Sequence, residues 1–411
     1  MEPKRDYLTL EDFELKNKTV LLRIDINSPI DPKTGAILDD RRMRSHIKTI
    51  KDLEAEDAKT VLLSHQSRPG KKDFTTMEEH AKRLRQLLKK EVKYVDDIFG
   101  SHSRNSIKAM KSGDIILLEN VRFYSEEQIE QSPQEHAKTQ LVRKLSSVVE
   151  IFLNDAFGTA HRSHASIVGF TAVLPSGAGR LMEKEIDTLN KVLERSESGG
   201  AVFVLGGAKV NDSIKVMRNA LEKGCADEIL VTGVVANVFL AAAGVNIGEK
   251  NFKFILDEGF EGEIENAKQL LSKYREKIVL PVDVALCKNN ARVEVAIDQI
   301  PSEYPIWDIG FETIDRFKRE IESAQVVVFN GPAGVNEVPD FALATNELLM
   351  ACTRAKFAVL GGGHTSAAVE KLGIESKVAH VSTGGGACMD YLAGEKMPGI
   401  IALIEAAKRL R

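Results

Sequence analysis

Residues Ala201 to Ser213, with the sequence AVFVLGGAKVNDS, decide the fold of the second half of the chain. The apolar run at their start is rich in Val and Phe, which predicts a buried strand of a parallel sheet. The strand ends at Gly206-Gly207, and Lys209 and a polar helix start come directly after it. Glycines let backbone N–H groups approach an anion, the start of a helix adds partial positive charge, and a lysine adds a full charge. The stretch therefore predicts a strand, a phosphate-binding turn and a helix.

The same half of the chain repeats this design. The further copies are VVVFNGPAGV (Val326 to Val335), FAVLGGGHTS (Phe357 to Ser366) and AHVSTGGGA (Ala379 to Ala387). One strand followed by glycines is often only structural. Four such strand ends predict a sheet with one edge lined by backbone amides.

The N-terminal half alternates short apolar runs with charged amphipathic stretches, which predicts a second open parallel sheet covered by helices. The predicted strands lie in TVLLRIDIN (Thr19 to Asn27), TVLLSHQSRP (Thr60 to Pro69), DIILLENVRF (Asp114 to Phe123) and EIFLNDAFGTAHR (Glu150 to Arg162). Helices are predicted over His80 to Lys90 and over Glu126 to Val149, the second broken near Pro133.

Polar and basic side chains lie at the end of each of these N-terminal strands. They are Arg23, Asp25 and Asn27, then His65 and Arg68, then Arg122, and finally His161, Arg162 and His164, while Arg42, like the later arginines, is expected in a loop or at a helix start. Ligands of open α/β sheets bind at the carboxyl ends of the strands, so these side chains predict one basic crevice. Any single arginine could be a surface ion-pair residue, and Arg23, inside its strand, is expected to contribute least. As a set, the guanidinium groups suit a small organic acid that carries both phosphate and carboxylate.

The predicted fold class is α/β, with two Rossmann-like domains whose parallel sheets face each other across a cleft and are joined by a helix and hinge. The N-terminal domain is predicted over residues 1–179, the interdomain helix over 180–200, the C-terminal domain over 201–394, and a last helix of undefined docking over 395–411. The apolar stripe of Ile186, Leu189 and Leu193 predicts the interdomain helix, which Ser198-Gly199-Gly200 ends.

The composition is that of a large globular protein with two or three domains, because 43% of its 411 residues are hydrophobic. A net charge of −4 argues against binding to nucleic acid, whose partners are usually basic. The four cysteines, Cys225, Cys287, Cys352 and Cys388, form no metal or redox motif, which predicts buried thiols in a reducing compartment. No signal peptide or membrane span is expected, so the predicted location is cytoplasmic.

Several common kinds of catalytic and binding site are excluded by the motifs. No G-x-x-x-x-G-K-[ST] is present, no G-x-G-x-x-G opens the first strand–helix turn, and no G-x-S-x-G is found. The histidines His65, His161 and His164 lack partners at zinc-ligand spacing, so contact with a phosphate or hydroxyl group is the better interpretation.

Seven segments, in this order and spread over nearly the whole chain, resemble phosphoglycerate kinase. They are RIDINSP (Arg23 to Pro29), SHQSRP (Ser64 to Pro69), ENVRF (Glu119 to Phe123), NDAFGTAHR (Asn154 to Arg162), LGGAKV (Leu205 to Val210), NGP (Asn330 to Pro332) and STGGG (Ser382 to Gly386).

The resemblance implies a site in each domain. The N-terminal domain would bind 3-phosphoglycerate through Asp25, Asn27, Arg42, His65, Arg68, Arg122 and Arg162. The C-terminal domain would bind ATP or ADP with Mg²⁺ through Gly206, Gly207, Lys209, Gly331, Pro332, Glu337, Gly361, Gly362, Gly363, His364, Thr365, Ser366, Gly384 and Gly385. The residues that it implies for catalysis are Arg42, Lys209 and Gly385.

The implied reaction is reversible phosphoryl transfer between 1,3-bisphosphoglycerate and ADP, which gives 3-phosphoglycerate and ATP in glycolysis or gluconeogenesis. A carboxylate nucleophile is already ionised at neutral pH, with a pKa near ~4, so no general base is needed. The task is to align two anions and stabilise a metaphosphate-like transition state, which requires the two domains to close about the connector. The expected partners are these small molecules, with neither nucleic acid nor membrane, and the protein is expected to be a monomer or homodimer.

Two positions depart from the commonest pattern of the family. His364 replaces an aspartate that serves as a magnesium ligand, and Ser213 replaces a second lysine, as in the archaeal branch that this chain resembles. A neutral imidazole is a poor partner for Mg²⁺, so no protein ligand of the metal is assigned. Two alternatives remain, a non-catalytic nucleotide-binding protein and a kinase for another small phosphorylated acid.

Overall fold

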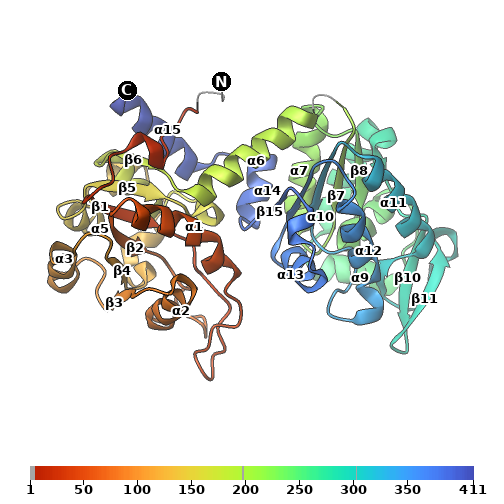
Figure 1. Cartoon of the computed structure of the whole chain (residues 1–411). Helices are drawn as coiled ribbons and strands as arrows, with labels where there is room; N and C mark the ends of the chain where they lie inside the picture. The colour runs from red at the N-terminus through yellow and green to blue at the C-terminus, as the bar shows by residue number, and fades with distance from the viewer. Residues whose placement is uncertain (1–4, 197–198, 302) are drawn as a thin grey trace. The chain divides into compact units, whose positions relative to one another are not determined.

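The computed structural model describes residues 5–196, 199–301 and 303–411, and contacts divide the chain into two compact units (Figure 1). The first unit contains the described residues up to Ile186 together with Lys396–Arg411, and the second is Asp187–Glu395. Each unit is built on a six-stranded sheet in which every strand pairs in parallel. The prediction of an α/β fold with two parallel sheets is confirmed.

The N-terminal sheet has the strand order β3-β4-β2-β1-β5-β6. Its strands are β1 (Thr19–Arg23), β2 (Lys59–Leu63), β3 (Lys93–Val95), β4 (Ile115–Leu118), β5 (Ile151–Asn154) and β6 (Ser176–Ala178). All five residues of β1 are buried, and the strand pairs with β2 on one side and β5 on the other. The carboxyl ends of these three strands therefore lie next to one another.

Helices cover both faces of this sheet. They are α1 (Arg41–Ala55), α2 (Glu78–Leu88), α3 (Ser101–Lys108), α4 (Pro133–His136), α5 (Gln140–Leu145) and α15 (Pro398–Leu410). Leu22 of β1 packs in one core with Met43 of α1. Its neighbour Leu21 packs in the other core with Val142 of α5. Successive residues of the strand thus serve opposite faces, as its pleat requires.

The helix predicted over residues 126–149, with a break near Pro133, is less extensive in the structure. The segment forms a 3₁₀ turn, Ser125–Gln128, followed by the separate short helices α4 and α5. Ser132 caps α4 by accepting a hydrogen bond from the Glu135 N–H at 3.2 Å. Pro133 occupies the first position of that helix, where a missing N–H costs little, so it starts a helix rather than interrupting one.

The C-terminal helix α15 belongs to the first unit, so the end of the chain packs on its N-terminal part. The N–H of Gly399 donates to the Ala160 carbonyl at 2.8 Å. Ala402 packs in a small buried cluster with Ile167 and Val168. The docking surface of the last helix, which the sequence left undefined, is therefore formed by the segment between β5 and β6 together with β6 itself.

The C-terminal sheet has the strand order β15-β14-β13-β7-β8-β9. Its strands are β7 (Ala201–Leu205), β8 (Glu228–Val231), β9 (Ile278–Val279), β13 (Val326–Asn330), β14 (Ala358–Gly361) and β15 (His380–Val381). The helices of this unit are α7 (Val210–Glu222), α8 (Gly233–Ala242), α9 (Glu249–Asp257), α10 (Glu261–Tyr274), α11 (Phe311–Ser323), α12 (Leu343–Cys352), α13 (Gly363–Leu372) and α14 (Gly386–Leu392). The central strand β7 coincides with the apolar run of the AVFVL segment.

The second unit also contains a three-stranded antiparallel sheet that the sequence patterns did not predict. Its order is β11-β10-β12, with β10 (Asp283–Lys288), β11 (Ala291–Ala296) and β12 (Ile306–Ile309). Arg292 of β11 holds it in place by donating to Asp308 of β12 at 2.7 Å. The alternation of charged and apolar residues in β11 is typical of a partly exposed strand, and no position of β11 is fully buried.

The connecting helix α6 spans Arg180–Ser196, and the division between the units falls inside it, after Ile186. Its predicted end at Ser198 lies outside the described residues. All four cysteines are buried, which confirms the burial predicted for their thiols. Over the described part of the chain, every helix is too short or too polar to cross a membrane.

Replacing Leu403 by Ala should lower the free energy of unfolding of the first unit by about 2–5 kcal/mol, because this fully buried side chain of α15 would leave a cavity. Ile401→Ala on the same helix is the matched control, since Ile401 is 44% exposed and its loss should cost less than about 0.5 kcal/mol. The two free-energy changes are measured by urea unfolding, with hydrogen exchange of peptides from the first unit as the signal. Equal effects of the two variants would contradict the docking of α15.

Candidate functional site

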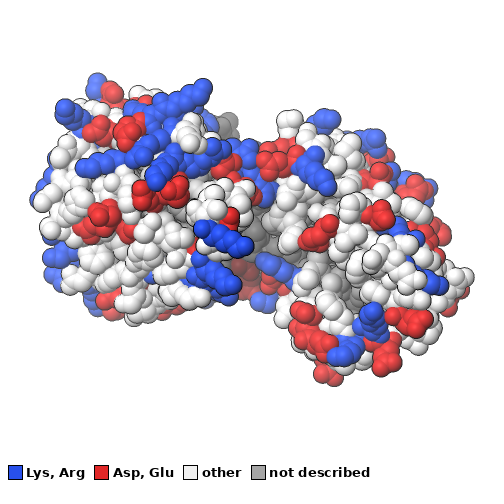
Figure 2. Space-filling view, turned by 90° about the horizontal axis from the view of Figure 1, so that it is seen from below, with Lys and Arg blue, Asp and Glu red and all other residues white. Residues whose placement is uncertain are grey.

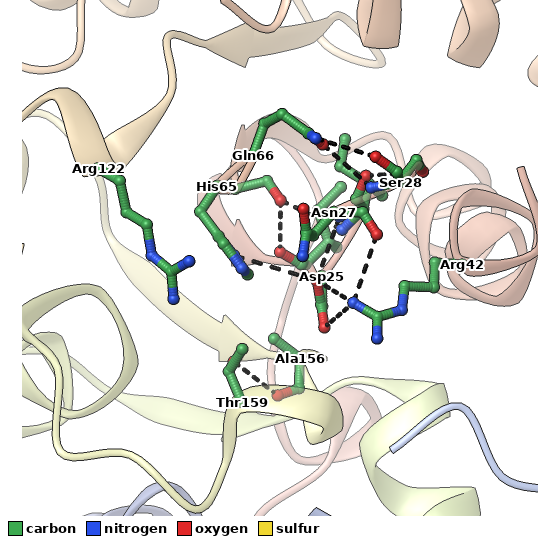
Figure 3. Close-up of polar contacts among 12 residues, drawn as sticks. Asp25, Asn27, Ser28, Arg42, His65, Gln66, Arg122, Ala156 and Thr159 are labelled. Atoms are coloured by element: carbon green, nitrogen blue, oxygen red, sulfur yellow. Dashed lines mark hydrogen bonds and ion pairs between the residues drawn. The ribbon is translucent and has the colours of Figure 1, made fainter. Parts of the chain in front are cut away.

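An ion pair at the end of β1 forms the centre of the N-terminal crevice. Arg42 lies in the first turn of α1, and its Nη1 donates to Asp25 Oδ2 at 3.1 Å and to the Asn27 carbonyl at 3.3 Å (Figure 3). Burial alone would raise the pKa of Asp25, but the charges of Arg42 and Arg23 help to bring it well below its usual range. Asp25 is therefore an ionised carboxylate, and Arg42 keeps more than a third of its side chain exposed to a ligand.

His65 lies just after β2 and is held by a buried arginine from the neighbouring strand. Arg23 Nε donates to Ser166 Oγ at 2.8 Å, and Arg23 Nη2 lies 3.2 Å from His65 Nδ1. Burial holds the pKa of His65 well below its ordinary value, so the ring is neutral. Because a guanidinium can only donate, Nδ1 accepts and Nε2 carries the proton. Arg23, expected to contribute least, thus fixes the tautomer of His65.

Arg122 approaches the same region from the 3₁₀ turn Val121–Phe123, which lies just after β4. Its Nη1 donates to the Ser67 carbonyl, and within the described residues its buried Nε has no hydrogen-bond partner. Figure 3 shows His65 between Arg122 and Asp25, with the side-chain nitrogens of His65 and Arg122 directed into the crevice. An unused buried donor of this kind is suited to an anionic ligand.

The arginines of the crevice lie close enough to repel one another. Burial and then the charges of Arg162 and Arg23 lower the pKa of Arg122 to about 10. Burial and then the charge of the exposed Arg68 lower the pKa of Arg162. Although the net charge of the chain is −4, basic side chains gather locally on the surface of the N-terminal unit (Figure 2). A bound anion would relieve this repulsion.

The remaining two histidines of this region have protein partners. His164 Nε2 lies 3.1 Å from a Glu130 carboxylate oxygen, and burial lowers the pKa of His164 to about 3. Arg162 Nε donates to His161 Nε2 at 3.2 Å. Both rings support the arginine-bearing loop after β5.

The C-terminal unit contains a pocket of about 480 Å³ at the carboxyl ends of its strands. The predicted residues that line it are Gly206, Gly207, Lys209, Gly331, Pro332, Glu337, Gly362, Gly363, His364, Thr365 and Gly385. Three predicted residues lie outside the lining. Gly361 is the last residue of β14, Ser366 lies one turn inside α13 and bonds to the Gly362 carbonyl, and the Gly384 N–H donates to Ser382 Oγ.

Close backbone contacts between the glycine loops shape this pocket. Gly206 donates its N–H to the Asn330 carbonyl at 2.9 Å, and Gly207 donates to the Pro332 carbonyl at 2.8 Å. Gly331 has a φ of +84°, and a Cβ there would lie 2.3 Å from the Gly206 carbonyl oxygen. Only glycine allows this approach, which leaves the starts of α8 and α13 facing the pocket.

The phosphoglycerate kinase family model matches residues 10–395. The chain belongs to the phosphoglycerate kinase family. It is 56% identical to phosphoglycerate kinase 2 of Methanosarcina acetivorans, over 97% of this chain and 95% of that protein, and 54% identical to the enzyme of Methanothermus fervidus, over 98% of each. A solved structure of phosphoglycerate kinase from Pyrococcus horikoshii is 42% identical, with a TM-score of 0.92 over 98% of this chain and 99% of that one. As a member of this family the chain is a phosphotransferase whose acceptor is a carboxyl group.

The two positions that depart from the common phosphoglycerate kinase pattern differ in their surroundings. His364, at the start of α13, is exposed, and its Nδ1 lies 3.5 Å from Oε1 of Glu337, which also lines the pocket. Ser213 is fully buried inside α7, and its Oγ has no partner in the described part of the chain. Ser213 therefore points into the unit rather than toward the pocket. Among the described residues, no group of three or more acidic, histidine or cysteine side chains could hold a metal ion.

Sequence reasoning missed a whole wall of the pocket. Trp307 and its neighbours in β12 line it together with Val284 of β10, and Asn237 of α8 and Met389 of α14 complete the lining. The Val335 N–H donates to the Trp307 carbonyl at 2.8 Å, which joins this wall to the loop after β13. The one signal for it was the single tryptophan of the chain, in the short segment IWDI.

Gly331→Ala should destabilise the C-terminal unit by about 1–3 kcal/mol, because its Cβ would collide with the Gly206 carbonyl in a left-handed conformation. Gly363→Ala is the matched control, since a Cβ at Gly363 meets no atom within 4 Å. Thermal unfolding of the two variants compares them. If Gly331→Ala were as stable as Gly363→Ala, the close packing of the loops after β7 and β13 would be disproved.

Proposed function

We propose that the two sites divide the phosphoglycerate kinase reaction between them. The basic crevice binds 3-phosphoglycerate or 1,3-bisphosphoglycerate, and the glycine-lined pocket binds ATP or ADP. The observation that carries this proposal is the cluster of buried and mutually repelling basic groups around Asp25, with the unused Nε of Arg122 among them. Such a cluster is suited to a small ligand with two negative groups.

In the crevice, Arg42 is the proposed contact of the reacting carboxylate because it is the exposed partner of Asp25. Asp25 and Asn27 are the proposed contacts near the hydroxyl and carboxyl end of the ligand. The proposed contacts of the phosphate of 3-phosphoglycerate are His65, through its Nε2–H, and Arg68, Arg122 and Arg162.

In the pocket, Lys209 and the amides of Gly206 and Gly207 are the proposed contacts of the nucleotide phosphates. The start of α13, from Gly362 to Thr365, and Gly385 before α14 add partial positive charge. Glu337 is the proposed acceptor for the ribose hydroxyls, and Pro332 lies on the proposed adenine side. The apolar wall around Trp307 suits the base.

The chemical step needs charge stabilisation rather than a proton acceptor. The carboxylate nucleophile is ionised at neutral pH. Arg42, Lys209 and the amide at Gly385 therefore act by stabilising the transferring phosphoryl group, an effect that is large only where water is excluded. Since the two ligands bind to different units, transfer requires their reacting atoms to meet, and α6 is the proposed hinge.

Magnesium enters this proposal as part of the nucleotide substrate. The exposed His364 is a weak partner for a hard cation, and the described residues offer no ligand set of their own. The metal is therefore held by phosphate oxygens and water. With this function we also expect a cytoplasmic location and a monomeric or homodimeric state.

The first test mixes the protein with MgATP and 3-phosphoglycerate, traps the acyl phosphate with hydroxylamine, and monitors ADP in parallel. We expect ADP and hydroxamate to form together and only with 3-phosphoglycerate. Nucleotide binding without any product would instead support a non-catalytic nucleotide-binding protein. Product with another phosphorylated acid, but none with 3-phosphoglycerate, would assign a different substrate.

Arg42→Ala should lower kcat at least about 100-fold, because it removes a guanidinium from the developing charge, while the KM for ATP changes little. Arg44→Ala is the matched control on the same helix, since the Arg44 side chain is exposed and its Nε donates to Asp40 at 2.8 Å rather than to Asp25. Steady-state kinetics with each substrate varied in turn measures both. A kcat for Arg42→Ala close to that of Arg44→Ala would remove Arg42 from the mechanism.

His364→Asp should remain active and reach half-maximal rate at a lower Mg²⁺ concentration, because a carboxylate at the start of α13 can bind the cation. The measurement is a magnesium titration of the rate at fixed total ATP. Loss of activity would show that His364 has a role of its own, which its approach to Glu337 would then explain.

A further inference from the structure

A buried carboxylate beyond β5 receives hydrogen bonds from two different helices. Asp155 Oδ2 accepts from His46 Nδ1 at 2.7 Å and from Thr49 Oγ1 at 2.8 Å, both on α1. Asp155 Oδ1 accepts from the backbone N–H of Leu181 at 2.8 Å and of Met182 at 3.3 Å, in the first turn of α6. The Asp155 side chain is fully buried, so these four donors replace water completely.

The local sequence accommodates this carboxylate at the start of α6. A Cβ on Gly179 would lie 2.2 Å from Asp155 Oδ1, so the residue before the helix has to be glycine. The N–H of Arg180 donates to Thr49 Oγ1 at 3.1 Å. The first three amides of α6, which no helical carbonyl can satisfy, are thus capped by Thr49 and Asp155 from distant parts of the chain.

His46 links this cap to the crevice. Its Nε2 accepts from the Asp25 N–H at 3.0 Å. A carboxylate accepts, so Nδ1 carries the proton that is directed to Asp155. Nε2 also lies 3.2 Å from the Asp25 carbonyl oxygen, so this ring nitrogen contacts both backbone groups of Asp25. His46 is only 1% exposed, and its two ring nitrogens connect the backbone of Asp25 to the carboxylate of Asp155.

One face of α1 carries the residues that meet both ends of this connection. Arg42, His46 and Thr49 are spaced by four and three residues, which places them on one side of the helix. Arg42 contacts the side chain of Asp25, His46 contacts its backbone, and Thr49 reaches the start of α6. The crevice and the first turn of α6 therefore share one continuous buried network.

We propose that His46 and Asp155 are positioning residues that couple occupancy of the crevice to the order of the first turn of α6. This inference rests on the proposed binding of 3-phosphoglycerate beside Asp25 and Arg42. A ligand held there restrains the Asp25 backbone, and the His46–Asp155 bond transmits that restraint to the amides of Leu181 and Met182. The coupling is reciprocal, so loosening the cap of α6 weakens binding in the crevice by the same factor.

Hydrogen exchange of the whole chain, with and without saturating 3-phosphoglycerate, tests this directly. We expect the ligand to slow exchange of the peptide covering residues 180–186 by roughly threefold or more. His46→Asn keeps a donor near the Nδ1 position but loses the acceptor for the Asp25 N–H. In this variant the ligand should still protect the crevice, but the effect on residues 180–186 should vanish.

The same variant gives a kinetic measurement that a merely structural role would not produce. His46→Asn should raise the KM for 3-phosphoglycerate about tenfold and leave the KM for ATP unchanged, because one buried donor loses its partner. Ile50→Val is the matched control, since Ile50 is buried one turn further along α1 and outside the network. It should lower the melting temperature without changing either KM or the exchange response.

Asp155→Asn gives a second test from the other end, because an amide can accept at only one of the two oxygen positions. We expect faster exchange at residues 180–186 with and without ligand, and a raised KM for 3-phosphoglycerate. The inference is overturned if the ligand protects the crevice of the unmodified protein but not residues 180–186, or if His46→Asn keeps the full response. Absence of both turnover and crevice protection would instead refute the proposed function.

Discussion

The buried carboxylate of Asp25 is the charge on which the N-terminal site depends. It lies beyond the central strand β1, and its negative charge compensates Arg42 and stabilises the neighbouring Arg23. A second buried carboxyl group, Glu127, accepts from Ser166 Oγ at 2.6 Å and offsets part of the remaining charge. Without these two groups, so many basic side chains could not be desolvated together.

The compensation is incomplete, which is consistent with the anionic ligand proposed for the crevice. After burial, the charges of neighbouring arginines lower the pKa of both Arg122 and Arg162, so positive charge remains in excess near the strand ends. The pocket of the C-terminal unit works differently, because backbone amides and helix starts supply partial charges rather than full ones. This difference fits the proposed ligands, because the nucleotide proposed for the pocket carries Mg²⁺ and the acid proposed for the crevice carries no cation.

Site residues that lie at the ends of strands could be predicted from the sequence. Site residues that reach the pocket because a separate sheet packs beside it could not. Gly206, Lys209 and Gly362 could be assigned to one site because each lies at or near the end of an apolar run. The wall around Trp307 could not, since β12 has only four residues, two of them only partly buried, and Arg292 of β11 binds its Asp308. The extent of the helix over residues 126–149 was wrong because capping residues, not hydrophobic periodicity, set its breaks.

Contacts between residues distant in the chain are the other part that the sequence could not supply. His46 and Asp155 are 109 residues apart, and neither belongs to a pattern that names the other. Asp155 lies in the segment after β5, whose arginine and histidines are predicted ligand contacts. The Asp155 side chain is nevertheless fully buried, and its oxygens accept hydrogen bonds from the protein. The Asp155 carboxylate needs space beside the start of α6, and glycine at position 179 provides that space. The first amide of α6, that of Arg180, needs another acceptor, which is the Thr49 hydroxyl. A motif residue can therefore act on the site by fixing the backbone behind it rather than by touching the ligand.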